Sequence, residues 1–287
     1  MAERPAMTHS PTVRRRRLSA ELLKLRTNVG LTADEVAKRL EWTPSKVTRI
    51  ERNEWKLPAV RDIRDLLDVY GVTDDEHREA LFTLAREARQ RGWWVDYQDV
   101  LGPRSVAEFE ADAAHIHMYE ALVIPGLLQT ADYAAAVFRG GQVLDQAFVD
   151  RAIAARLARQ EILERDNPPY LWVILDEAAL RKKVGGAAVM RDQLRHIVEM
   201  CSRPNIAVQV VPDEAGAHAA MSGSFVIYEY ATPEDGTLVY VETGIGDLFL
   251  ERPEEVSRYT VKYDHVRALA LSEEATVAHL ESLSAQL

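Results

Sequence analysis

The segment Leu31–Glu51, LTADEVAKRLEWTPSKVTRIE, predicts two short helices joined by a tight turn. Thr32 and Glu35 have the spacing of a capping box, which begins the first helix. Thr43 is expected to cap the second helix, with Pro44 at its first position, where a missing N–H is harmless. Each helix therefore has its own start signal, and the rest of the N-terminal region can be placed around this pair.

The second helix of this pair has an apolar side and a polar, cationic side. Val47 and Ile50 fall on the apolar side at helical spacing. The outward positions are Ser45, Lys46, Thr48, Arg49 and Arg52. A short helix with this distribution fits the major groove of DNA. The pattern therefore predicts a helix that reads DNA.

Two further helices flank the pair. One is expected over residues 18–28, with leucines inward every three or four residues and Gly30 after its end. The other is expected over residues 60–70 and ends at Gly71. Residues 1–13 lack periodicity and are expected to be disordered, as part of a basic tail over residues 1–17. The cations of Arg14–Arg17 are interpreted either as an arm that contacts DNA or as a solvated helix start.

Residues 18–72 resemble the XRE-type, phage-repressor-like helix-turn-helix domain in spacing and residue type over four helices. The resemblance implies base contacts from the first turns of the second helix of the pair, and a buried ion pair between Arg26 and Glu51. We expect the DNA-binding residues to be Thr32, Thr43, Pro44, Ser45, Lys46, Thr48, Arg49, Arg52, Lys56, Arg15 and Arg16.

Charge is divided unevenly along the 287 residues, whose net charge is −10. Residues 1–60 carry 13 basic and 7 acidic side chains, while the remainder carries 22 basic and 38 acidic ones. The positive end can approach phosphates, whereas the acidic remainder would be repelled by them. One cysteine, no long apolar run and no signal-peptide pattern predict a cytoplasmic protein that does not enter a membrane.

The remainder of the chain predicts a second domain of mixed structure. Residues 73–105 are expected to form a linker helix and a junction, and residues 106–287 a C-terminal domain. Within that domain, residues 106–165 have a helical pattern. Short strands are then expected over residues 170–175, 206–211, 224–228, 238–241 and 248–250. The fold class is therefore α+β overall: an all-α N-terminal domain, and a mixed α/β domain with a sheet of about five strands.

Motifs in this second half resemble those of WhiJ-like, antitoxin-like actinobacterial regulators. They include PGLLQT at residues 125–130, DEAALR at 176–181, VQVVP at 208–212 and VYVE at 239–242. The resemblance implies a transcription factor whose C-terminal domain binds a partner, often a small protein encoded next door. It supplies no catalytic residues.

Candidate catalytic and metal-binding residues are few. His115 and His117 fall in the segment expected to be helical, where a spacing of two puts them on different faces and makes a poor metal pair. His218 lacks the lysine two residues later that phospholipase-D-like hydrolases use. Asp176 and Glu177 are explained better by helix capping than by acid–base chemistry. We therefore predict no enzyme, metal or cofactor.

Arg156, Arg159 and Gln160 could bind an anion, although a solvated helix face is the simpler interpretation. Taken together, the sequence predicts a sequence-specific DNA-binding regulator, a homodimer on a two-fold operator. Its C-terminal domain would bind a small partner protein or a small-molecule signal. The alternative is a hydrolase domain, with His218 involved, fused to a DNA reader.

Overall fold

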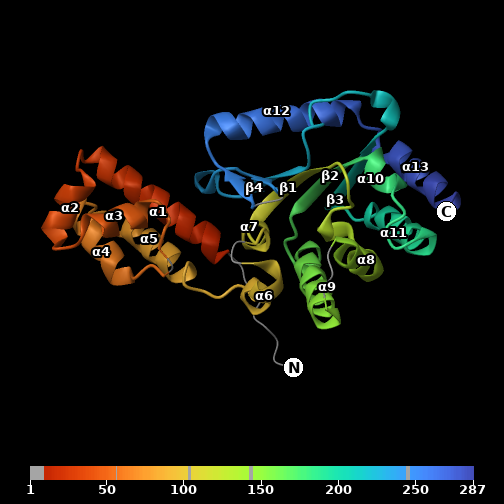
Figure 1. Cartoon of the computed structure of the whole chain (residues 1–287). Helices are drawn as coiled ribbons and strands as arrows, with labels where there is room; N and C mark the ends of the chain where they lie inside the picture. The colour runs from red at the N-terminus through yellow and green to blue at the C-terminus, as the bar shows by residue number, and fades with distance from the viewer. Residues whose placement is uncertain (1–9, 56, 103–104, 142–144, 244–245) are drawn as a thin grey trace. The chain divides into compact units, whose positions relative to one another are not determined.

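The structure, a computed structural model, describes residues 10–55, 57–102, 105–141, 145–243 and 246–287 (Figure 1). The chain divides into two compact units. The first comprises Met1–Val95 with Thr232–Asp235, and the second comprises Asp96–Ala231 with Gly236–Leu287.

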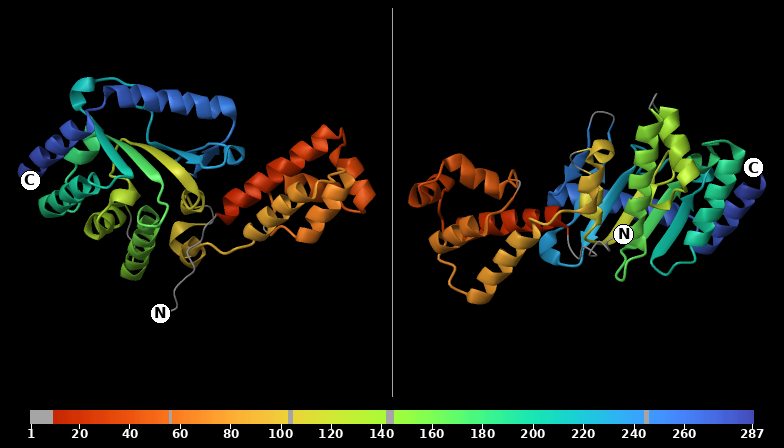
Figure 2. Two further views of the ribbon diagram at one scale, coloured as in Figure 1. Left: turned by 180° about the vertical axis from the view of Figure 1, so that it is seen from behind. Right: turned by 90° about the horizontal axis from the view of Figure 1, so that it is seen from below.

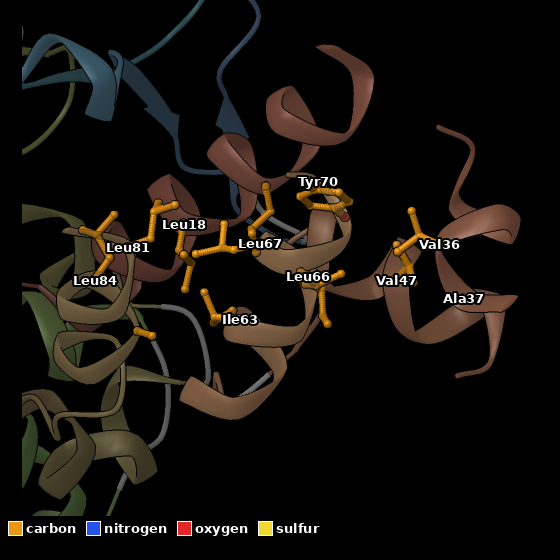
Figure 3. Close-up of a cluster of buried hydrophobic side chains, with 13 residues drawn as sticks. Leu18, Val36, Ala37, Val47, Ile63, Leu66, Leu67, Tyr70, Leu81 and Leu84 are labelled. Carbon is orange, nitrogen blue, oxygen red and sulfur yellow. The ribbon is translucent and has the colours of Figure 1, made fainter. Parts of the chain in front are cut away.

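The first unit is helical where it is described. Its helices are α1 (Pro11–Asn28), α2 (Ala33–Leu40), α3 (Pro44–Glu51), α4 (Val60–Val69) and α5 (Asp75–Glu87). They share one apolar core, shown in Figure 3, to which every helix contributes. Its fully buried members include Leu18, Val36, Val47, Ile63, Leu66 and Leu67. The expected apolar faces of these helices are therefore the ones that pack together.

Helix α1 begins at Pro11, well before the expected start at residue 18. The Ser10 hydroxyl accepts a hydrogen bond from the Val13 N–H at 3.3 Å, and Pro11 occupies the first turn. A serine followed by proline is a helix start signal, and here it lies eight residues before the expected start. The expectation of a disordered basic tail is thus wrong for residues 11–17; residues 1–9 lie outside the described part.

Helix α5 was expected to link the two domains, but it packs inside the first unit. Asp74 caps it by accepting a hydrogen bond from the Glu76 N–H at 3.2 Å. Its apolar stripe, Leu81, Leu84 and Ala85, is buried in the core shared by the other helices. The stripe is therefore used within this unit.

The second unit is built on a mixed sheet of order β3-β2-β1-β4-β5-β6. The strands are β1 (Ala113–Glu120), β2 (Tyr170–Asp176), β3 (Ile206–Val211), β4 (Phe225–Tyr230), β5 (Leu238–Val241) and β6 (Leu248–Leu250). Strands β1, β2 and β3 run parallel to one another, and β4 pairs antiparallel with β1. The α+β class and the five expected strands are confirmed. The additional strand, β1, lies where a helix was expected.

Helices cover both faces of this sheet (Figures 1 and 2). Helix α12 (Pro253–Leu269) lies over one face, and its Tyr263 and Val266 pack on Tyr119, Ile174 and Ile227. On the other face lie α8 (Ala131–Gly141) and α9 (Gln146–Gln160), which connect β1 to β2. The remaining helices are α6 (Gln98–Leu101), α7 (Ala107–Glu110), α10 (Glu177–Arg181), α11 (Ala187–Met200) and α13 (Glu273–Ala285). Among the described helices, none is both long and apolar enough to cross a membrane.

Candidate nucleic-acid interface

Helix α3 is the expected DNA-reading helix, and its two sides differ as predicted. Val47 and Ile50 are fully buried. Thr43, Pro44, Ser45, Arg49 and Arg52 are exposed, and Lys46 and Thr48 are half-buried. The polar side is thus presented to solvent at the first turns, where base-reading side chains are found in helix-turn-helix proteins.

The start of α3 differs from the expectation in one respect. Thr43 occupies the cap position with an extended backbone, but its side chain makes no capping hydrogen bond. Its hydroxyl instead lies 3.2 Å from the Ser45 hydroxyl. The first N–H groups of α3 are therefore left without a side-chain cap, and helix N-termini of this kind attract phosphate groups.

Lys46 is held by two neighbours. Its Nζ lies 3.0 Å from an Asp62 carboxylate oxygen on α4 and 3.6 Å from the centre of the Trp42 ring. Both contacts attract the ammonium group, so part of its charge is already compensated before DNA arrives. Arg49 is more exposed, and we expect it to contribute more to base recognition than Lys46 does.

Replacing Asp62 by asparagine is expected to tighten binding to DNA of any sequence. The change frees the Lys46 ammonium and removes a negative charge beside α3. One additional phosphate contact should steepen the slope of log affinity against log salt concentration by about 0.9. Fluorescence anisotropy with a duplex at several salt concentrations measures this slope.

Asp68→Asn is the matched control, since Asp68 lies near the end of the same helix and pairs with Arg78 at 2.8 Å. We expect its salt slope to equal that of the unmodified protein. An unchanged salt slope in Asp62→Asn would show that the ion pair with Asp62 does not keep Lys46 from contacting a phosphate.

The expected ion pair between Arg26 and Glu51 is present. The Arg26 Nε and Nη2 donate to the two Glu51 carboxylate oxygens at 2.6 and 3.0 Å, and Nη1 donates to the Leu31 carbonyl at 2.5 Å. The Glu51 carboxylate raises the pKa of Arg26 by accepting these hydrogen bonds. One guanidinium thus connects α1, the end of α3 and the turn before α2, which fixes the direction of α3.

Arg15 and Arg16 were expected on a DNA-binding arm, but both are half-buried residues of α1. The Arg15 Nε donates to the Asn53 side-chain oxygen at 2.8 Å. Asn53 has a positive φ of 57°, a conformation that asparagine tolerates well. Arg15 therefore supports the turn after α3. Lys56, another expected contact, lies outside the described residues.

Thr32 is exposed and forms the predicted capping box of α2. Its hydroxyl accepts from the Glu35 N–H at 3.2 Å, while its own N–H donates to a Glu35 carboxylate oxygen at 2.8 Å. These hydrogen bonds lower the pKa of Glu35. The Thr32 side chain is thus occupied in starting α2, and its contact with DNA stays a prediction.

In the second unit, His218 forms hydrogen bonds through both of its ring nitrogens. The Ala220 N–H donates to the Nδ1 atom of His218 at 3.3 Å, so the ring proton is on Nε2. The Nε2–H group then donates to an Asp176 carboxylate oxygen at 3.3 Å. The Tyr119 hydroxyl donates to that same oxygen at 3.0 Å, and the other Asp176 oxygen accepts from the Ala178 N–H. Both ring nitrogens of His218 are therefore engaged in holding the loop to the strand end.

His115 and His117 lie on β1, so the expectation that they face apart on a helix is wrong. Alternate residues of a strand share a face, and the two rings are parallel within 2°. Both approach the Glu229 carboxylate, at 3.9 and 3.6 Å. Burial lowers the pKa of His117. The described residues nevertheless contain no cluster arranged to hold a metal ion.

The solvated-face interpretation of α9 is also wrong. Gln160 donates to the carbonyls of Gly126 and Gln129 at 2.8 and 2.7 Å, and Arg156 donates to the Gln129 side-chain oxygen at 2.7 Å. These bonds hold the turn that follows β1. The polar residues of the PGLLQT motif and of α9 are thus partners of one another, a contact that the sequence alone did not predict.

Arg159 forms a buried ion pair with Glu110 of α7. Its Nε and Nη2 donate to the two carboxylate oxygens at 2.6 and 2.5 Å, and the Tyr228 hydroxyl donates to the carboxylate at 3.3 Å. Burial opposes the charge of Arg159, but the Glu110 carboxylate outweighs it, so the pKa of Arg159 is raised. This pair connects α7, α9 and the centre of the sheet.

Comparison with known families agrees with the division into two parts. Residues 17–81 match the family described as helix-turn-helix domain, which indicates a DNA-binding regulator. Residues 103–282 match the family described as domain of unknown function (DUF5753). No curated protein and no solved structure matches the chain. Since the second match spans more than half of its length, the chain belongs to the DUF5753 family and carries a helix-turn-helix domain at its N-terminal end.

Proposed function

We propose that the protein is a sequence-specific, XRE-type transcriptional regulator related to the WhiJ-like, antitoxin-like regulators. The observation that carries the proposal is α3, which exposes Ser45 and Arg49 while the Arg26–Glu51 pair holds its other end. The positive charge of residues 1–60 supports an approach to phosphates. We further propose that the protein works in the cytoplasm as a homodimer on a two-fold operator.

The C-terminal domain is proposed to receive the signal, as a binding domain for a small molecule or a small partner protein. Its conspicuous polar residues hold its own turns and strand ends, as Gln160 and His218 do. A His218 with both nitrogens engaged has no free nitrogen to activate a nucleophile. This supports a binding role over the hydrolase alternative. Co-purification with the product of an adjacent small reading frame would identify a protein partner.

Arg49→Ala is expected to remove about 1–3 kcal/mol of discrimination between the operator and other DNA, because an exposed arginine on this helix is suited to reading guanine. The measurement is fluorescence anisotropy with two duplexes. One carries the sequence upstream of the protein's own gene, and the other is a shuffled duplex of equal composition. The unmodified protein should prefer the first.

Arg86→Ala is the control, because Arg86 lies on α5 and pairs with Glu79 at 2.7 Å. We expect it to keep the preference. Equal binding of both duplexes by the unmodified protein would refute sequence-specific recognition. A footprint with two half-sites one helical turn apart, about 34–36 Å, would support the homodimer.

A further inference from the structure

The connection between β4 and β5 enters the first unit. Strand β4 ends at Tyr230 and β5 begins at Leu238, and the two strands pair antiparallel in the sheet. The segment Thr232–Asp235 between them, here called the β4–β5 loop, belongs to the helical unit instead. Since each residue of chain spans at most about 3.6 Å, a displacement of these strand ends acts directly on the loop.

Asp235 fixes this loop to α1. It is only 4% exposed. Its Oδ2 accepts a hydrogen bond from the Arg14 Nη1 at 3.4 Å, and its Oδ1 lies 3.8 Å from the Arg17 Nη1, one turn along the same helix. A carboxylate is tolerated in such a buried position only when cations or hydrogen-bond donors compensate it. The loop is therefore held by charge at the beginning of α1.

The same arginine also contacts the end of α5. The Arg14 Nε lies 3.4 Å from a carboxylate oxygen of Glu87, the last residue of that helix. After α5 the chain passes into the second unit between Val95 and Asp96. The buried Arg14 guanidinium thus contacts both the loop that comes from the sheet and the helix that leads to it.

Helix α1 connects this guanidinium to the DNA-reading helix. Arg15 donates to Asn53 in the turn after α3, and Arg26 pairs with Glu51 at the end of α3. Arg14 and Arg26 lie about 18 Å apart along one continuous helix, at a rise of about 1.5 Å per residue. Rigid elements of this kind can carry a displacement from one end to the other.

We propose that the β4–β5 loop couples the sheet to α3, through the Asp235 carboxylate and α1. In the described arrangement Asp235 is docked, and α1 holds α3 in position to read DNA. A signal that displaces the ends of β4 and β5 would withdraw Asp235 from Arg14 and Arg17 and shift the helix that positions α3. The inference rests on the proposed signal-receiving role of the C-terminal domain, and it names the route of the regulation.

Two features favour coupling over a purely structural role. The connection between β4 and β5 is longer than the two to five residues that are usual in β-hairpins, so its length is not needed to join the strands. A buried ion pair also adds little stability compared with apolar packing, whereas it can select one arrangement among several. A contact made by Asp235 is therefore better suited to fixing a position than to strengthening the fold.

Coupling between two parts of a protein is reciprocal, so DNA can serve as the probe while the signal is unidentified. The full chain is saturated with the duplex upstream of its own gene, and hydrogen exchange is followed by mass spectrometry in peptides covering β4 and β5. We expect DNA to slow exchange in these peptides by about fivefold or more. Unchanged exchange on a duplex that is bound would overturn the proposal.

Asp235→Asn keeps the size of the side chain and removes its charge. We expect the duplex still to bind, but the DNA-induced protection of β4 and β5 to disappear. Glu234→Gln is the matched control, because Glu234 is the preceding residue, carries the same charge and is exposed. It should keep the full protection. Equal protection in the two variants would contradict the route through Asp235.

A milder variant is needed because Asp235 is buried and its replacement risks unfolding the first unit, which the melting temperature reports. Arg17→Gln removes the half-buried partner at 3.8 Å and should reduce the DNA-induced protection at least about twofold. Lys24→Gln is its control, because Lys24 is exposed on the same helix. Equal protection in Arg17→Gln and Lys24→Gln would overturn the proposal.

The outcomes distinguish this proposal from the one on which it rests. Operator binding without any change of exchange in β4 and β5 refutes the route and leaves the DNA-reading function standing. A protein without preference for its operator refutes the DNA-reading function and, with it, a regulatory purpose for the loop.

Discussion

Glu51→Ala is expected to lower the free energy of unfolding of the helix-turn-helix unit by about 3–5 kcal/mol. The side chains of Arg26 and Glu51 are only 14% and 6% exposed. Removing the carboxylate therefore leaves a half-buried guanidinium with the Leu31 carbonyl as its remaining protein partner. The cost comes from this uncompensated charge more than from the loss of the ion pair itself.

Hydrogen exchange measured by mass spectrometry can assign the loss to its unit. Peptides from α3 and α4 should exchange faster in Glu51→Ala, while peptides from β1 and β2 should keep their protection, because they belong to the second unit. Equal loss of protection in both units would show that the unit does not unfold independently, and the free energy would then refer to the whole chain.

A double variant separates the contribution of the Arg26–Glu51 pair to stability from its role in directing α3. Replacing Arg26 and Glu51 together by methionine removes both charges and keeps apolar volume, so it should recover much of the stability lost in Glu51→Ala. If the pair serves to direct α3, the recovered protein should still discriminate poorly between operator and shuffled DNA. A double variant as unstable as Glu51→Ala would contradict the explanation by an unpaired charge.

The first unit could be predicted well because its signals are local. The capping box of Thr32 and Glu35 and the apolar spacing of Val47 and Ile50 lie within single helices, and each fixes an element without reference to distant residues. The missed part, the early start of α1 at Ser10, also had a local signal. The basic run that follows this signal, Arg14–Arg17, is what resembles an unstructured tail.

Strand β1 could not be found in this way. Phe109, Ala113 and Ile116 have helical spacing, and the alternation of polar and apolar residues is short, since it covers only His115–Met118. What makes the segment a strand is its pairing with β2, in which His115 lies opposite Tyr170. Such pairing is a long-range property, and no local pattern contains it.

The contacts between the PGLLQT motif and α9 could not be predicted for the same reason. Arg156 and Gln129 were both visible in motifs, but the hydrogen bond between them spans 27 positions of the sequence. Glu120 lies in a segment with a helical pattern, so its position beside Ser224, next to the paired residues Tyr119 and Phe225, could not be predicted. A sequence shows which residues carry charge, while the sheet register decides which of them meet.

Glu110→Ala is expected to destabilise the second unit by about 3–5 kcal/mol. Glu110 is 1% exposed and Arg159 is 15% exposed, and both carboxylate oxygens accept hydrogen bonds from the guanidinium. The variant leaves Arg159 buried without the Glu110 carboxylate that pairs with it. Hydrogen exchange should increase in peptides from α9 and β4.

Glu164→Gln is the matched control, because Glu164 is 64% exposed and pairs with Arg203 at 3.0 Å. An exposed pair of this kind contributes about 0–1 kcal/mol. Similar effects of the two changes would contradict a structural role for the buried pair. Adding Arg159→Met to Glu110→Ala should restore stability, since the unpaired cation is then gone. The recovery would show that Glu110 is needed because Arg159 is charged.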